Sequence, residues 1–190
     1  MLKPHANPWK TLEQKVIYEN PFLRVRVDRV IKPDGKPGFY SVTDSGHSNI
    51  VIPVTDEWLF YIVSQWRYPR EYYSWEFPGG KKEKDENSLE TAARELLEET
   101  GLVAESLKLI GTLDLLSGMS ENVYDVLLAE KVRQTKSISN NEDGIHGIRA
   151  VTLKELLSLM GNEIKNAQSM AALMLYISSD PRVARKCFTA

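Results

Sequence analysis

The chain has 190 residues, of which 42% are hydrophobic and 26% charged, and its formal net charge is −2. This length suits one globular domain with a full core, and the near balance of charge excludes the basic footprint of a nucleic-acid-binding protein or an attraction to an anionic membrane. The single cysteine excludes an internal disulfide framework and a metal site built from several thiolates.

The N-terminal stretch MLKPHANPWK lacks the apolar core of a signal peptide, and no later segment has the apolar length of a membrane span. We therefore expect a cytoplasmic protein. Residues 22–31 (FLRVRVDRVI) alternate in polarity as a half-buried strand does, and Asp34-Gly35 is a hairpin-turn signal before the returning strand FYSVTDS. We expect residues 1–45 to form a β arm that packs on the core or dimerises, and residues 46–190 to form the main domain.

The main domain reads as strands around one central helix. The apolar runs NIVIPVT and WLFYIVSQW predict two strands, and LKLIGTLDLL and NVYDVLLAEKV predict two more after the helix. TLKELLSLM and AQSMAALMLYI have helical spacing near the C-terminus. This order favours an α+β fold or a mixed-sheet sandwich.

The central helix, which follows Gly79-Gly80, concentrates negative charge. Ser88 is the expected N-cap and Gly101 the expected C-terminal cap, and an apolar stripe is predicted at Leu89, Ala92, Ala93, Leu96 and Leu97. The opposite face carries Glu95, Glu98 and Glu99, which repel one another at helical spacing. These carboxylates form either a solvated face in which Arg94 pairs with Glu90 and Glu98, or a site for a hard divalent cation such as Mg²⁺ or Mn²⁺. The glycine pair would let a backbone carbonyl approach the same cation.

The segment resembles the signature of the Nudix hydrolases at every position of the pattern Gly80-x5-Glu86-x7-Arg94-Glu95-Leu96-x-Glu98-Glu99-x-Gly101-Leu102. The resemblance implies the Nudix fold, which is an α+β fold with a mixed sheet between helices. It also implies hydrolysis of a nucleoside diphosphate linked to another moiety, with Mg²⁺. It also implies roles for individual residues. Glu95 and Glu99 would be the main metal ligands, Glu98 an additional ligand, and the Gly79 carbonyl a backbone ligand. Arg94 would orient the glutamates, and Glu86 would hold the loop to the helix.

Flanking segments resemble the branch that hydrolyses ADP-ribose and nucleotide sugars. QWRYP followed by WEFPGG places Arg67 where that branch has an arginine that contacts the diphosphate; its alternative role is a surface cation at a strand end. The loop NNEDG places Glu142 where the branch has a metal-binding or water-activating glutamate, although the loop alone is as consistent with an ordinary polar surface. Glu121, in SGMSEN, is a second candidate for the base or for substrate contact.

Trp9 and other aromatics of the arm are candidates for stacking on the nucleobase, although aromatic residues in strands more often serve packing. The resemblance also implies a homodimer, because the branch packs or exchanges this arm between subunits. The expected activity is Mg²⁺-dependent cleavage of ADP-ribose or a related nucleoside diphosphate sugar into a nucleoside monophosphate and a sugar phosphate. The alternatives are a Nudix hydrolase of GDP-mannose or an oxidised nucleotide, and a nucleotide-sugar binding module without catalysis.

Overall fold

The computed structural model describes residues 6–136 and 144–188, and the chain divides into two compact units. The first unit contains the residues up to Gly46 together with Asp114–Val123. The second contains His47–Leu113 and the residues from Tyr124 onward. The segment Asp114–Val123 therefore belongs with the N-terminal strands, although it lies far from them in the sequence.

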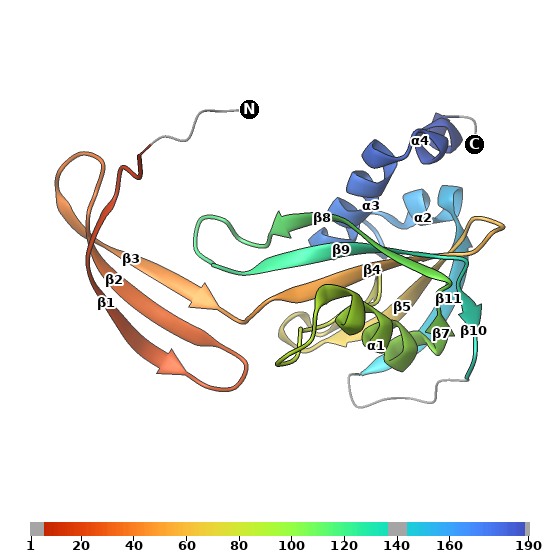
Figure 1. Ribbon diagram of the computed structural model, residues 1–190, viewed down its shortest axis with the longest axis horizontal. Coiled ribbons are helices and arrows are strands. Elements are labelled where there is room, and N and C mark those ends of the chain that lie inside the picture. The colour runs from red at the N-terminus through yellow and green to blue at the C-terminus, as the bar shows by residue number, and fades with distance from the viewer. Residues whose placement is uncertain (1–5, 137–143, 189–190) are drawn as a thin grey trace. The chain divides into compact units, whose positions relative to one another are not determined.

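The first unit is built on a three-stranded antiparallel sheet of β1 (Lys10–Glu19), β2 (Arg24–Ile31) and β3 (Pro37–Asp44), in that order (Figure 1). The β2–β3 hairpin confirms the strands predicted around Asp34-Gly35. Strand β1 was not predicted, because its sequence KTLEQKVIYE has no regular alternation of polarity. All ten residues of β1 are exposed, so this strand contributes no buried side chain to the unit.

The second unit contains a mixed sheet. Its strands are ordered β11 (Ile145–Thr152), β5 (Leu59–Arg67), β4 (Ser48–Val54), β9 (Val123–Glu130) and β8 (Ser106–Asp114), and β6 (Tyr72–Glu76) also pairs with β5. Strands β4 and β9 run parallel, whereas β11 and β6 are antiparallel to β5. A two-residue ladder joins β7 (Leu102–Val103) to β10 (Arg133–Gln134), and the turn after β5 is a short 3-10 helix, Tyr68–Arg70.

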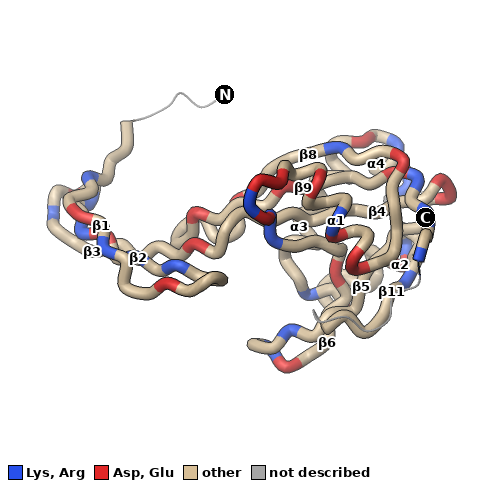
Figure 2. The backbone as a smooth tube through the Cα atoms, turned by 60° about the horizontal axis from the view of Figure 1, so that its bottom comes forward, with Lys and Arg blue, Asp and Glu red and all other residues tan. Residues whose placement is uncertain are grey.

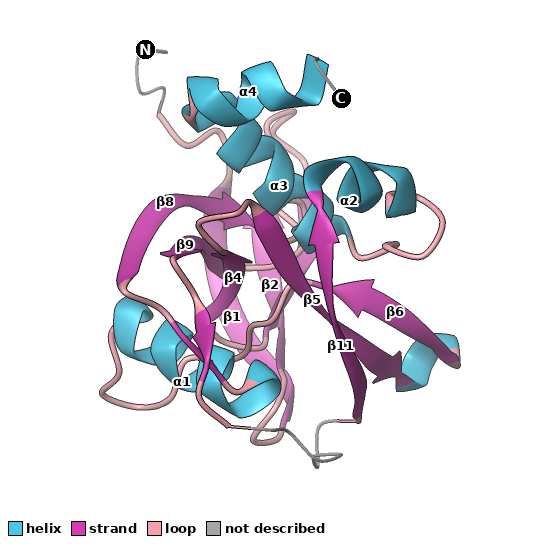
Figure 3. Ribbon diagram, turned by 90° about the vertical axis from the view of Figure 1, so that its right-hand side faces the viewer, coloured by secondary structure: helices cyan, strands magenta, loops and turns pink. Residues whose placement is uncertain are grey.

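Helices cover both faces of this sheet (Figures 1 and 3). Helix α1 (Ser88–Thr100) packs on β4 from one side; α2 (Leu153–Leu159), α3 (Ala167–Ser179) and α4 (Pro181–Phe188) lie on the other. The core under α1 joins apolar residues of the helix, β4, β9 and the adjoining turns: Val51, Ala92, Leu96, Leu102, Leu127, Ala129 and Val132. The predicted α+β class, with helices enclosing a mixed sheet, is confirmed. None of the helices in the described ranges has the length and apolarity that crossing a bilayer requires.

Helix α1 differs from its prediction in two respects. Its N-cap is Asn87, which forms a capping box with Glu90, whereas the hydroxyl of Ser88 donates to Asp125 on β9. The predicted apolar stripe is also only partly buried: Ala92 and Leu96 are covered, but Leu89 is 45% exposed, and Glu99 is 4% exposed. A glutamate thus occupies a position on the packed side of the helix. The predicted C-terminal cap is confirmed, since Gly101 has φ 69° in the left-handed region.

We expect Asn87→Ala to lower the free energy of unfolding by about 1 kcal/mol, because the Asn87 side chain accepts hydrogen bonds from the backbone N–H groups of Leu89 and Glu90. Urea denaturation measures this change. Lys84→Ala, at an exposed position of the preceding loop, is the matched control and should be neutral. An unchanged stability of Asn87→Ala would show that another group caps the helix.

Candidate functional site

The segment from Pro78 to Lys82 runs antiparallel along the first half of β4, with a β-bridge between Lys81 and Ser48. Three backbone hydrogen bonds hold it there: Asn49 N–H to Gly80 O (2.8 Å), Val51 N–H to Pro78 O (2.8 Å) and Lys82 N–H to His47 O (2.9 Å). In such pairing the N–H and C=O groups of one residue point to the same side, and the next residue points to the opposite side. Gly79 therefore directs its backbone groups away from β4. Its N–H donates to Glu99 Oε2 of α1 at 2.9 Å.

The two glycines are required by close contacts on both sides of this segment. A Cβ on Gly80 would lie 2.1 Å from Glu95 Oε1, and a Cβ on Gly79 would lie 2.3 Å from the carbonyl oxygen of Asn49. Both distances are far below van der Waals contact. The sequence predicted a close backbone approach at the glycine pair, and the structure has one: the carboxylate of Glu95 lies directly against the Gly80 Cα.

Arg94 connects the loop to the helix carboxylates. Its guanidinium binds both carboxylate oxygens of Glu86 (2.8 and 3.0 Å), Glu95 Oε1 (2.9 Å), Glu98 Oε2 (3.1 Å) and the backbone oxygen of Lys81 (3.2 Å). The hydrogen bonds from Arg94, which outweigh desolvation, lower the pKa of Glu86 to about 2, so this carboxylate is ionised at neutral pH. The alternative in which Arg94 pairs with Glu90 is wrong, because Glu90 closes the capping box.

The three helix carboxylates are not arranged as a preformed metal site. Among the described residues, no group of three or more acidic, histidine or cysteine side chains is close enough together to hold a metal ion. The predicted convergence of Glu95, Glu98 and Glu99 is therefore incomplete: Arg94 holds the first two, and the Gly79 N–H contacts the third. The residue types still fit Mg²⁺, which takes carboxylate and carbonyl oxygens and keeps several waters of its own. Glu95, Glu99 and the Gly79 carbonyl would supply such oxygens.

Arg67 lies at the end of β5, and its guanidinium forms a bidentate ion pair with Glu76 of β6. The hydrogen bonds that Arg67 donates to Glu76 raise the pKa of Arg67 against the opposing effect of burial, and the charge of Glu99 adds to the increase. Arg67 is thus within electrostatic reach of a helix carboxylate. The sequence analysis missed Glu76. An acid directly before the apolar FPGG segment is the signal that could have identified it.

A second missed group anchors the start of α1. Asp125 of β9 is 5% exposed; it accepts hydrogen bonds from the hydroxyls of Ser88 and Thr112, and it lies 3.0 Å from His47 Nε2. Desolvation acts to raise the pKa of Asp125, but these partners outweigh it and the pKa is lowered. A buried carboxylate on a strand therefore fixes the first turn of the helix, eleven residues before Glu99.

Acidic and basic positions lie next to one another along α1 and the loop before it (Figure 2). The same unit also contains a cavity of about 370 Å³ lined by residues such as Trp58, Lys108, Glu130, Tyr176 and Arg182, none of which is a predicted site residue. Its charges are largely paired, with Lys108 bound to Glu130 and Arg182 to Asp180. We place the candidate site at α1, because the helix carboxylates, the Arg94 guanidinium and the backbone of Gly79-Gly80 meet there.

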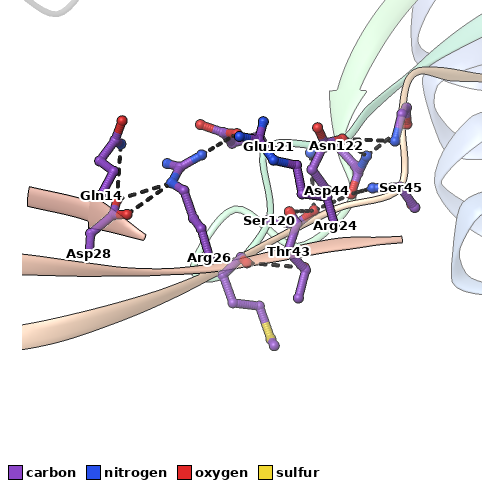
Figure 4. Close-up of polar contacts among 12 residues, drawn as sticks. Gln14, Arg24, Arg26, Asp28, Thr43, Asp44, Ser45, Ser120, Glu121 and Asn122 are labelled. Carbon is purple, nitrogen blue, oxygen red and sulfur yellow. Dashed lines mark hydrogen bonds and ion pairs between the residues drawn. The ribbon is translucent and has the colours of Figure 1, made fainter. Parts of the chain in front are cut away.

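The other predicted site residues lie elsewhere. Trp9 belongs to the first unit, where its ring packs edge-on against Tyr40 with centroids 5.3 Å apart. Glu121 is in the same unit, and its carboxylate binds Arg26 Nη1 at 2.6 Å, while Arg26 also binds the buried Asp28 (Figure 4). One oxygen of the Glu121 carboxylate is therefore engaged by Arg26. Glu142 lies outside the described residues.

Comparison with known proteins agrees with these features. Residues 47–173 match the NUDIX domain family, and residues 9–43 match the family described as the nucleoside diphosphate sugar hydrolase N-terminal domain. The chain is 31% identical over 166 residues to an ADP-ribose pyrophosphatase of Bacillus subtilis (strain 168), which covers 86% of this chain and 90% of that protein. It is 28% identical over 149 residues to a methanol dehydrogenase activator of Bacillus methanolicus, which covers 78% and 80%.

The fold is shared with a solved structure. A crystal structure of an ADP compounds hydrolase matches with a TM-score of 0.79 over 93% of this chain and 98% of that one, at 16% sequence identity. One assignment follows from the two family matches, the relative from Bacillus subtilis and the shared fold. The chain belongs to the Nudix hydrolases, as a member of the pyrophosphatase family that carries a nucleoside diphosphate sugar hydrolase N-terminal domain.

Proposed function

We propose that this enzyme hydrolyses the diphosphate bond of ADP-ribose or a closely related nucleoside diphosphate sugar, with Mg²⁺, and releases a nucleoside monophosphate and a sugar phosphate. The observation that carries the proposal is the arrangement around Gly79. The Gly79 N–H donates to Glu99, and the Glu95 carboxylate lies against Gly80. The charge of Glu99 also acts on Arg67. Carboxylates for a cation and an arginine for an anion are the two requirements of a diphosphate substrate.

In this proposal the Glu95 and Glu99 carboxylates and the Gly79 carbonyl would hold Mg²⁺, and Glu98 would be an additional ligand. The ion would neutralise the diphosphate and lower the pKa of the attacking water. Arg94 keeps Glu95 and Glu98 in place through its own hydrogen bonds. Arg67 would contact the diphosphate. We propose Glu142 as the base and Glu121 as the alternative, whose ion pair with Arg26 argues against it.

The choice of ADP-ribose rests on the N-terminal family match and on the relative from Bacillus subtilis. Another Nudix substrate, such as GDP-mannose or an oxidised nucleotide, is the alternative within the class. A binding module without catalysis is less consistent with the structure. A module that only binds a sugar nucleotide would not need Glu99 buried against the Gly79 N–H, since burying a carboxylate costs free energy.

We further propose that the enzyme is a homodimer formed through the first unit. Apolar side chains of β1 are exposed, among them Leu12 (43%), Ile17 (57%) and Tyr18 (53%), and Phe39 of β3 is 75% exposed. Several large apolar side chains exposed on one small sheet are typical of a protein–protein interface. A second copy of the same sheet is the occupant we propose, because most soluble oligomers are symmetric homo-oligomers.

A substrate panel tests the activity. With Mg²⁺, the enzyme should hydrolyse ADP-ribose or another nucleoside diphosphate sugar faster than nucleoside triphosphates, and the products should be a nucleoside monophosphate and a sugar phosphate. Chelation with EDTA should abolish turnover, because protein groups alone do not neutralise the diphosphate. Product identification by chromatography checks both points. Activity that persists in EDTA, or is confined to triphosphates, would contradict the proposal.

Glu99→Gln should lower kcat by at least about 100-fold, the loss typical of removing one group that stabilises charge in a transition state. Its folding should be intact, since the glutamine keeps the volume and an oxygen that accepts the Gly79 N–H. Steady-state kinetics and a melting temperature measure the two effects. Glu105→Gln, which changes an exposed acid paired with Lys131, is the control and should behave as wild type. Near-normal turnover of Glu99→Gln would remove this residue from the site.

Ile17→Asp should convert a dimer into a monomer, because a charge in an apolar interface is desolvated without a partner. Light scattering after size exclusion gives the mass, which for the wild type should be twice the 21.6 kDa of the chain. Lys10→Asp, at a polar exposed position of the same strand, should leave the dimer intact. A wild-type enzyme that stays monomeric at micromolar concentration would refute the interface.

A further inference from the structure

Glu76 is a buried carboxylate that has no role in the proposed hydrolysis. It is the last residue of β6 and is 3% exposed. Burying an ionised carboxylate is costly unless an opposite charge and hydrogen bonds compensate it. The compensation comes from Arg67, whose Nε and Nη2 contact the two carboxylate oxygens of Glu76.

The strand register explains why these two side chains meet. Arg67 pairs with Tyr72 and Val63 pairs with Glu76, so Arg67 and Glu76 lie on one face of the β5–β6 ladder, four residues apart along it. This face is covered around Glu76, where Val63 and Ser74 are 1% exposed, and it is open at Arg67, whose side chain is 43% exposed. Between the two lies the pair of Ser74 and Gln65, so Arg67 extends along the sheet past Ser74 to reach Glu76. Without Glu76, a long arginine at the end of a strand would have no reason to turn toward the interior.

The pair also fixes which edge of the guanidinium remains available. Arginine has five N–H groups, and Glu76 uses one on Nε and one on Nη2. The side edge of the guanidinium is thus bound to Glu76, and the end edge, formed by Nη1 and Nη2, faces elsewhere. Two parallel N–H groups on that edge match two oxygens of a phosphate. Tyr61 of β5 packs on the core under α1, and alternate residues of a strand share a face, so Arg67 lies on the side of the sheet where α1 carries its carboxylates.

We propose that Glu76 is a positioning residue: it holds Arg67 by its side edge so that the end edge is presented to the diphosphate of the substrate. This inference rests on the proposed function, because it assumes that Arg67 binds a diphosphate. It makes Glu76 necessary for substrate affinity without any contact of its own with the substrate.

A double-mutant cycle tests the proposal. Glu76→Gln, Arg67→Ala and the double variant are assayed with Mg²⁺ on the diphosphate substrate that the wild type hydrolyses best. Glu76→Gln should raise KM about tenfold, as expected for the loss of one charged contact, with kcat within about threefold. The double variant should be no worse than Arg67→Ala, because Glu76 acts only through Arg67. Glu130→Gln, which breaks the Lys108–Glu130 pair elsewhere in the unit, should leave KM unchanged.

Either of two kinetic results would overturn the proposal: effects of the single variants that multiply in the double variant, or a Glu76→Gln enzyme with a lower melting temperature but an unchanged KM. If Glu76→Gln does not fold, Glu76→Asp replaces it; this variant keeps the charge but withdraws it by one methylene, and it should still raise KM. The same cycle is run on the dissociation constant of pyrophosphate, measured by calorimetry with Mg²⁺. A wild type that binds pyrophosphate but hydrolyses no nucleoside diphosphate would contradict the proposed function alone. Failure to bind pyrophosphate would overturn the positioning role.

Discussion

The pairing of Pro78–Lys82 with the edge of β4 is the constraint on which the rest of the site depends. It uses the backbone groups of alternate residues for the sheet and leaves those of Gly79 directed toward α1. A side chain at position 79 would clash with the carbonyl oxygen of Asn49 on β4, and one at position 80 would displace the carboxylate of Glu95. The start of α1 is tied to the same sheet by Asp125 and its hydrogen bond from Ser88. Loop and helix are therefore held by one scaffold, and the distance between them is set by the sheet.

The charges around this scaffold follow a simple pattern. Arg94 binds Glu86, Glu95 and Glu98, while Arg67 binds Glu76 and lies within the field of Glu99. Among these contacts five carboxylates face two guanidinium groups, which leaves an excess of negative charge. Such an excess is unfavourable in a partly buried region and attracts cations. A site that must bind an anionic diphosphate therefore has a physical use for divalent cations, and Arg67 supplies a contact that does not depend on them.

Much of this arrangement could be predicted from the sequence, and the failures have particular causes. Local patterns predicted the β2–β3 hairpin and the Gly101 cap, because turn and cap chemistry is decided within a few residues. Asn87 and Ser88 are both good N-caps, and Asp125, distant in sequence, decides between them by binding the Ser88 hydroxyl. Helical spacing places Glu99 on the packed side of α1, after Ala92 and Leu96, but the apolar pattern alone assigned that side to hydrophobic residues. The pair of Arg67 and Glu76 depends on strand register, which no local pattern specifies.

The central claim is that the Gly79 loop and the carboxylates of α1 form the metal site of a diphosphate hydrolase. The most direct test is anomalous diffraction from crystals soaked with Mn²⁺ and a methylene analogue of ADP-ribose that cannot be hydrolysed. The account predicts Mn²⁺ peaks about 2.1 Å from oxygens of Glu95 and Glu99 and from the Gly79 carbonyl, with the diphosphate bound to the same ions. Mn²⁺ that binds elsewhere, with these oxygens still held only by Arg94 and the Gly79 N–H, would contradict it.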